Sequence, residues 1–373
     1  MRMLAKTFAA VSLAAIALTT ADAKELRLAS GAPPVHPAAD PLYKKFAEFL
    51  PQETNGALTG AQIGPEVVNI VQVKQALQSS LAEVGNLLPL FAPAELPNTA
   101  LTGDLAFLAT NPHAMGAAMT EYVVTCEECQ IEFKKLGGVF MGAGSSDVYV
   151  LLTTKPVRSM DDLKGLRLRS GGAPYARWAD AVGAAPAQVP VSDQFEQISQ
   201  GVLDGTMGSI SDLVSYRLID VAKYVIDLPL GTYHTTSNFT VASGAWGEMS
   251  AEERAGLARA ANRASALFTE NWGYERPENV RKQAVEAGLE IIPATQEMID
   301  ATNEFRKNDI DAAVEVATSQ LGVKDAAAKI ARFQELVDKW TAIVDDLDSD
   351  VAKVTAKVQE EVWNKVDYST YGL

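Results

Sequence analysis

The chain has 373 residues and a formal net charge of −15 at pH 7, with 47 acidic residues against 32 lysines and arginines. This excess of negative charge disfavours binding to nucleic acid and to anionic membrane surfaces, although local donors in a cleft still suffice to bind a small anion. A chain of this length exceeds what one hydrophobic core usually supports, so two lobes are expected.

Residues 1–23 have the pattern of a secretory signal peptide. Arg2 and Lys6 precede the apolar stretch Thr7 to Leu18, and Ala21-Asp22-Ala23 is a small-residue cleavage pattern. The apolar stretch is about a dozen residues long, short of the roughly 20 that span a bilayer. We therefore expect a cleaved signal, a periplasmic protein and no membrane insertion; an uncleaved N-terminal anchor is the alternative.

The first part of the mature chain predicts strands mixed with helices. Leu42, Phe46 and Leu50 recur every four residues, which is the spacing of one helix face, and Thr54-Asn55-Gly56 is a turn signal that ends this helix. The expected elements are a strand over 25–30, helices over 41–50 and 67–80, a strand over 81–87 and a long helix over 115–136.

From Asp147 onward short strands alternate with short helices. Ser159 to Lys164 reads as a capped turn closed by Gly165, and Ser192 reads as the cap of another helix. Such alternation indicates an α/β lobe whose ligand groups lie at strand ends. The expected strands cover 148–153, 166–169 and a stretch from 202, and a helix covers 174–182.

The C-terminal part is mostly helical after a strand over 239–243 that returns to the first lobe. Ser250 and Glu253 form a capping box, and further helical patterns cover 297–316, 323–344 and 351–363. The fold class is therefore α/β with two lobes and a helical C-terminus. We assign the first lobe to 24–146 plus 235–275, the second lobe to 147–234 plus 276–345, and a C-terminal helical extension to 346–373.

Cys126 and Cys129 are the only two cysteines, spaced Cys-x-x-Cys. Glu127 and Glu128 between them would raise a thiol pKa, which disfavours redox catalysis. Zinc would need two more ligands, and the three histidines are scattered singly. A structural disulfide and a pair of partly buried thiols both remain open, and we expect no metal and no cofactor.

The sequence resembles the solute-binding proteins of TRAP transporters, the tripartite family named for C4-dicarboxylate uptake. The most specific piece is Asp162-Leu163-Lys164-Gly165-Leu166-Arg167-Leu168-Arg169, and the resemblance covers roughly residues 25 to 345. The supporting pieces, in the same order along the chain, are His36-Pro37, Phe46-Ala47-Glu48, Thr54-Asn55-Gly56, Gly201-x-x-Asp204-Gly205 and Trp246-x-x-Met249-Ser250-x-Glu252-Glu253.

The resemblance implies two α/β lobes, joined by crossing strands and a long hinge-spanning helix, that close on a ligand whose carboxylate pairs with Arg169. A planar guanidinium offers two parallel donors to a carboxylate and keeps its charge in a closed cleft. Arg167 lies on the same side of the strand by its spacing, so spacing alone does not separate the two arginines. Many members carry a second arginine and an asparagine where this chain has Tyr149 and Gly208, so a doubly charged dicarboxylate is less strongly indicated than a monocarboxylate, an aromatic acid, a hydroxy acid or a sulfonate.

Aromatic side chains and one amide complete the candidate ligand site. Tyr175 and Trp178 lie at i and i+3 of the helix after Arg169, and Tyr233 with His234 lies at the crossing between lobes. They read either as an aromatic wall for an apolar ligand or as core packing. Asn86, late in its strand, is a candidate amide donor from the first lobe.

The expected function is capture of a small organic acid and its delivery to the small and large membrane subunits of a TRAP permease. An enzyme would need an activated nucleophile, an acid/base pair or a metal site, and none of the usual motifs is present in the sequence. The remaining alternative is a binding protein for an ABC importer or a ligand sensor, because its binding chemistry would look the same.

Overall fold

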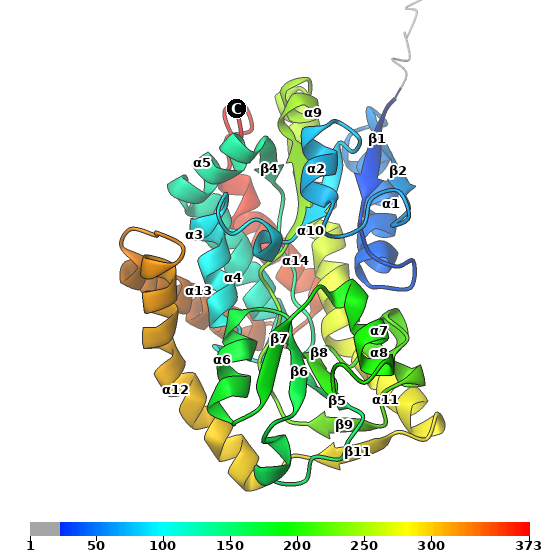
Figure 1. Cartoon of the computed structure of the whole chain (residues 1–373). Helices are drawn as coiled ribbons and strands as arrows, with labels where there is room; N and C mark the ends of the chain where they lie inside the picture. Colours follow the sequence, from blue (N-terminus) through cyan, green and yellow to red (C-terminus); the bar gives the residue numbers. More distant parts are fainter. Residues whose placement is uncertain (1–22) are drawn as a thin grey trace, which may run out of the picture.

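The computed structural model describes residues 23–373, and the predicted signal peptide lies, apart from its last residue, outside this range. The chain forms two lobes, each built on its own β-sheet (Figure 1). This arrangement confirms the expected α/β fold with two lobes.

The sheet of the first lobe has five strands in the order β2-β1-β3-β10-β4. β1 is parallel to β2 and β3, whereas β10 is antiparallel to β3 and β4. As expected, a strand from late in the chain therefore returns to the first lobe. The bounds are β1 Lys24–Ala29, β2 Leu58–Ile63, β3 Val84–Leu87, β4 Gly138–Phe140 and β10 Ser237–Ala242.

The sheet of the second lobe has six strands in the order β11-β9-β5-β8-β6-β7. β6 is parallel to β7 and β8, and β5 is antiparallel to β8 and β9. One hydrophobic cluster lies on each face of this sheet, around Trp178 on one side and Leu213 on the other. The bounds are β5 Val150–Thr153, β6 Arg167–Ser170, β7 Ala185–Gln188, β8 Gly205–Gly208, β9 Tyr224–Asp227 and β11 Glu290–Pro293.

Helices surround both sheets. Helices within 44–136, 243–270 and 326–361 share one hydrophobic core with the first sheet, and helices within 173–215 and 276–286 cover the second sheet. The bounds are α1 Lys44–Glu53, α2 Val73–Gln78, α3 Pro97–Ala100, α4 Pro112–Thr125, α5 Glu127–Leu136, α6 Ala173–Ala181, α7 Gln194–Ser199, α8 Asp212–Ser215, α9 Ser243–Gly247, α10 Ala251–Glu270, α11 Arg276–Glu286, α12 Gln296–Ser319, α13 Ala326–Asp346 and α14 Val351–Glu361.

Two extended segments cross between the lobes side by side. One joins β4 to β5 and the other joins β9 to β10. They hydrogen-bond to each other, with the Ser146 N–H donating to the Tyr233 carbonyl at 2.9 Å and the Tyr149 N–H donating to the Gly231 carbonyl at 2.8 Å. Helix α10 also continues into the second lobe, through the π-helical turn η7 (Asn271–Glu275) into α11.

Helix α12 runs along one side of the molecule from the second lobe toward the first and connects the two cores (Figure 1). Its Met298 belongs to the second-lobe core, whereas Ala313 and Ala317 belong to the first. Helix α13 then packs along α4, and its buried Phe333 and Trp340 also belong to the first core. We therefore propose that residues 313–345 belong with the first lobe rather than with the second.

Three local predictions were wrong. The helix over 115–136 is two helices, α4 and α5, because Cys126 adopts an extended conformation and starts the second. The helix over 67–80 is confined to α2. Ser192 makes no cap for α7, since its hydroxyl donates to Asp193 instead. The capping box of Ser250 and Glu253 is confirmed.

Candidate ligand-binding site

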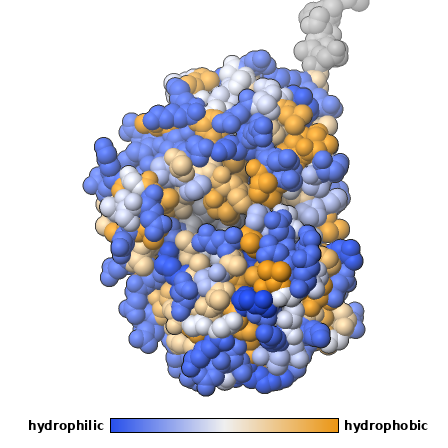
Figure 2. Space-filling view, viewed as in Figure 1, coloured by the Kyte–Doolittle hydropathy of each residue, from blue (hydrophilic) through white to orange (hydrophobic). Residues whose placement is uncertain are grey.

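A cavity lies between the lobes, where the space not filled by atoms, including open solvent, is about 650 Å³. The face shown in Figure 2 is hollowed between them, and hydrophobic side chains gather in that hollow. Both lobes and the crossing elements contribute to its wall. The lining residues are Ala32, His36, Ala38, Ile70, Asn86, Leu88, Leu90 and Phe91 from the first lobe, Tyr149, Arg169, Gly171, Val191, Asp212 and Tyr216 from the second, and Tyr233, Thr236, Phe268 and Trp272 from the crossing segment and α10–η7.

Among the residues that line the cavity, Arg169 is the one arginine. It lies on β6, is 6% exposed, and its Nε donates to the carbonyl of Val189 at 3.1 Å. Within residues 23–373 no acceptor is bonded to its Nη1 or Nη2. Gly171 leaves room for this guanidinium, because a Cβ there would lie 3.1 Å from Nη1. A guanidinium held through Nε, with both Nη nitrogens unbonded in the described part of the chain, is suited to receive a planar anion.

Arg167 is bonded to Asp204, which distinguishes it from Arg169 in a way that spacing alone does not. Its Nε and Nη2 each donate to the Asp204 carboxylate at 2.9 Å, and Lys155 binds the same carboxylate at 2.8 Å. These bonds hold the pKa of Asp204 well below its usual range, through the hydrogen bond from Arg167 first. Arg167 begins its strand and its side chain is half exposed. It does not line the cavity.

Three other predicted residues line the cavity with Arg169. Asn86 of β3 donates from Nδ2 to the Ser30 carbonyl at 3.4 Å, and its Oδ1 is buried without a partner among the described residues. Tyr149 stacks on Tyr233 with ring centroids 6.3 Å apart. The hydroxyl of Tyr233 is also buried and unpartnered within residues 23–373, and burial raises its pKa well above the usual value. A ligand or water must satisfy these polar atoms.

Two predicted residues lie next to this cavity. Tyr175 stacks on Tyr149 with ring centroids 5.1 Å apart and lines an adjoining hollow that shares Leu90, Gly171 and Tyr233 with the cavity. Gly208 ends β8 under the cavity wall, where a Cβ would lie 2.9 Å from Asp212 Oδ2.

Trp178 and His234 lie away from the cavity. Trp178 is fully buried in the core of the second lobe and donates from Nε1 to the Thr302 hydroxyl at 3.2 Å. The ring nitrogens of His234 lie 3.3 and 3.1 Å from the carbonyl oxygens of Thr232 and Thr102, and its ring stacks on Phe333. Burial lowers the pKa of His234 to about 4, so the ring is neutral at pH 7. The contacts of Trp178 and His234 support a role in core packing rather than in an aromatic wall for the ligand.

Sequence reasoning did not predict several of the residues that line the cavity. Trp272 and Tyr216 both pack edge-on against the ring of His36, and Trp272 also packs against Phe268. Trp272 lines the cavity from the π-helical turn η7, a feature without a signal in the sequence. The carboxylate of Asp212, buried at the start of α8, was also missed. Its position four residues past the end of β8, the strand that follows Asp204, was the one available signal.

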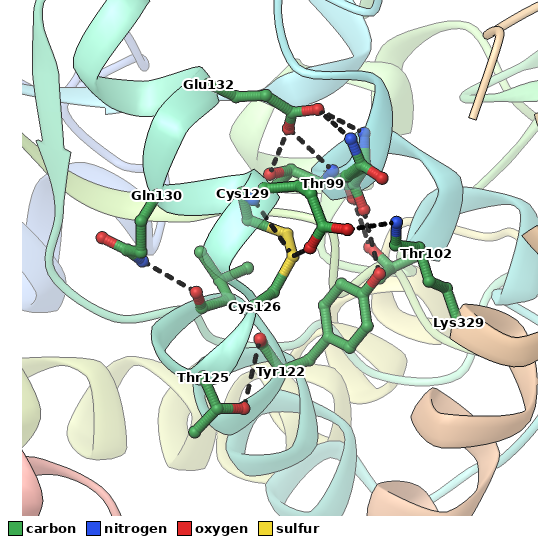
Figure 3. The surroundings of a disulfide bond; sticks show 12 residues. Thr99, Thr102, Tyr122, Thr125, Cys126, Cys129, Gln130, Glu132 and Lys329 are labelled. Atoms are coloured by element: carbon green, nitrogen blue, oxygen red, sulfur yellow. Dashed lines mark hydrogen bonds and ion pairs between the residues drawn. A yellow bond between two sulfur atoms is a disulfide. The ribbon is translucent and has the colours of Figure 1, made fainter. Parts of the chain in front are cut away.

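The cysteines form a disulfide at the junction of α4 and α5 (Figure 3). The Sγ of Cys126 accepts the backbone N–H of Cys129 at 3.1 Å, so Cys126 caps α5. Nearby, the buried carboxylate of Glu132 accepts hydrogen bonds from Asn98 and Thr99 (Figure 3). None of these residues lines the cavity between the lobes.

The described residues contain no group of three or more histidine, cysteine or acidic side chains placed to hold a metal ion. In the same part of the chain, no helix is both long and apolar enough to cross a membrane.

Two α/β lobes that enclose a cavity with a held arginine define the class of two-lobe solute-binding proteins. The chain belongs to the bacterial extracellular solute-binding proteins of family 7 (DctP), whose sequence profile matches residues 28–315. The expected resemblance is thereby confirmed, and the family is one of periplasmic solute-binding proteins of TRAP transporters.

Known proteins similar to this chain agree with this family. A TRAP periplasmic solute-binding protein of Bordetella bronchiseptica, solved with bound (R)- and (S)-mandelate, is 24% identical with a TM-score of 0.72, covering 85% of this chain and 99% of its own. One from Rhodoferax ferrireducens, in complex with copurified benzoate, is 16% identical with a TM-score of 0.76, covering 86% and 99%.

Among curated proteins, a solute-binding protein of a Sulfitobacter strain is 27% identical over 330 residues, which are 83% of this chain and 91% of that protein. A shorter match, 30% identical over 96 residues, spans 26% of this chain and 29% of an uncharacterized Haemophilus influenzae protein.

Proposed function

We propose that this protein captures a small organic acid anion in the periplasm by closing its lobes around it, and that it delivers the anion to the small and large subunits of a TRAP permease. The observation that carries the proposal is Arg169, a buried guanidinium held through Nε, with two free nitrogens in the wall of the cavity between the lobes. Such a group pairs with one carboxylate in a bidentate manner.

The walls favour a monocarboxylate with an apolar or aromatic body. Arg169 is the sole lysine or arginine among the residues that line the cavity, while Tyr149, Tyr216, Trp272, Phe268 and other apolar side chains form most of the wall. Proteins of the same fold bind mandelate, benzoate, 3-hydroxybenzoate or pyroglutamic acid, all of which carry one carboxylate. We infer that a second fixed cation, as a dicarboxylate would require, is replaced here by Tyr149.

In this proposal the protein releases its ligand chemically unchanged. The family assignment favours a TRAP permease as the partner over an ABC importer or a sensor. Isolation of membrane partners with the ligand-loaded protein tests the identity of the partner. Recovery of ABC permease subunits in place of TRAP subunits would contradict it.

A thermal-shift screen of organic acids tests the ligand class. An acid present at about 100 times its dissociation constant stabilises the folded state by roughly 2.7 kcal/mol. We expect one or more monocarboxylates to raise the melting temperature, and their amides, such as mandelamide beside mandelate, to have no effect. Stabilisation by the amides to the same extent would contradict an anion site.

A further inference from the structure

The cavity also contains a carboxylate that the function proposed above does not use. Asp212 begins α8 and is 4% exposed, yet it lines the same cavity as Arg169. Its Oδ2 accepts one hydrogen bond, from Gln194 Nε2 at 3.3 Å. No hydrogen bond to Oδ1 is formed within residues 23–373, and Asp212 makes no ion pair with Arg169 within 4.0 Å.

A buried carboxylate with one weak donor is costly, because it has lost water without gaining enough hydrogen bonds in return. Burial raises the pKa of Asp212 to about 6, and the charges of Arg169 and Arg276 together with the Gln194 hydrogen bond only partly oppose this rise. At neutral pH the group is therefore largely ionised and in need of a donor.

The surrounding side chains do not supply that donor. Arg276 interacts with Asp212 through its charge but does not bond to it, since its Nη2 donates to the Ser215 hydroxyl at 3.4 Å and its buried Nε has no partner among the described residues. The ring of Trp272 donates from Nε1 to Ser209 at 3.2 Å. One wall of the cavity thus presents free donors at Arg169 and a free acceptor at Asp212.

We infer that the ligand is an organic acid that carries a hydrogen-bond donor, a hydroxyl or an ammonium group, with its carboxylate on Arg169 and its donor on Asp212. The inference rests on the proposed function and narrows it. An acid without such a donor, of the benzoate type, binds Arg169 but leaves the Asp212 carboxylate unpaired. Hydroxy acids and amino acids share the required chemistry, and the test below separates them.

Calorimetry with matched acids tests this inference at pH 7.5. The first set of probes is phenylacetate, mandelate and phenylglycine. Next to the carboxylate these carry no donor, a hydroxyl and an ammonium group, in that order. The second, smaller set is propionate, lactate and alanine, which carry the same groups in the same order. In the wild-type protein we expect a donor-bearing acid to bind at least tenfold more tightly than the plain acid of its set, as a hydrogen bond to a charged group implies. Equal affinities within both sets would overturn the inference.

Two variants identify the partner of the donor. Asp212→Ala should reduce the advantage of the donor-bearing acid to less than about threefold, while the plain acid keeps its affinity or gains some because a negative charge near the bound anion is removed. Asp212→Asn retains an acceptor oxygen but no charge, so a hydroxyl ligand should keep part of its advantage and an ammonium ligand should lose nearly all of it. Asp220→Ala, which removes a half-exposed acid outside the cavity, is the matched control and should change nothing.

The outcomes distinguish this inference from the proposed function. If the acids bind and Asp212→Ala leaves the advantage of the donor intact, the role of Asp212 is wrong and the Arg169 site stands. If none of these acids, nor any in the thermal-shift screen, binds the wild-type protein, the proposed function fails as well. Thermal unfolding establishes that each variant is folded, and the wild-type comparison decides the question even where a variant does not fold.

Discussion

Arg177 of α6 donates from Nη1 to the carboxylate of Asp104 at 2.6 Å and so joins the second lobe to a segment whose neighbours Leu101 and Leu105 belong to the first core. The same guanidinium binds Asp309 of α12 through Nε at 2.6 Å and Nη2 at 2.8 Å. All three side chains are mostly buried. One cation thus holds two acids at the junction of the lobes and the long helix.

Replacing Arg177 with Ala should lower the free energy of unfolding by about 3 kcal/mol or more, because it leaves two buried carboxylates without their partner. Urea denaturation measures the loss. The matched control is Arg217→Ala, which breaks the exposed pair with Asp220 and should cost less than about 1 kcal/mol. Equal losses in the two variants would contradict a structural role for the Arg177 cluster.

Asp147, in the crossing segment before β5, should make stability depend on pH. Its Oδ2 accepts the Ile210 N–H at 3.2 Å, its Oδ1 has no partner among the described residues, and burial raises the pKa of Asp147 to about 8. The folded protein therefore holds a proton that the unfolded chain releases near pH 4, so Asp147 destabilises the fold increasingly as pH rises from about 4 to 8.

Asp147→Asn imitates the protonated form and removes this dependence. The free energy of unfolding of the variant minus that of the wild type should rise by about 2 kcal/mol between pH 6 and pH 8 and then level off. Urea denaturation at pH 6, 8 and 9 gives the difference. A difference that stays constant from pH 6 to pH 8 would show that Asp147 is already ionised in the folded protein at pH 6.

The sequence predicted the order of elements well, because periodicity and caps are local signals. The capping box at Ser250 is an example, since both of its bonds lie within four residues. The sequence leaves open what a contact between distant residues decides. His234 at the lobe crossing reads either as a site residue or as core packing, and in the structure its ring lies 3.1 Å from the Thr102 carbonyl, 132 residues away. Arg167 and Arg169 share one side of the strand, and the bonds of Arg167 to Asp204, 37 residues away, distinguish the two arginines in a way that local spacing does not predict.

The disulfide should affect stability and leave binding unchanged. It closes a very short loop, for which the chain-entropy relation gives about 2 kcal/mol. Cys126 and Cys129 lie outside the cavity, so replacing both with Ser should lower the free energy of unfolding by about that amount and change ligand affinity less than tenfold. A larger loss of affinity in the folded double variant would reveal a role of the disulfide in binding.

Ligand binding should bring the lobes together by bending near residues 146–148 and 234–237, within the two crossing segments. Small-angle X-ray scattering of the ligand-free and saturated protein measures this as a decrease in the radius of gyration. An unchanged radius at saturation would contradict closure.

The central claim is that Arg169 binds the anionic group of the ligand, and calorimetry on three variants tests it most directly. With the tightest acid from the screen, Arg169→Ala should lose about 2 to 5 kcal/mol of binding free energy, and Arg169→Lys should recover only part because it lacks the planar pair of donors. Arg167→Ala should bind as the wild type does, since Arg167 is committed to Asp204 outside the cavity. Affinity near that of the wild type in Arg169→Ala, or a larger loss in Arg167→Ala, would contradict the account.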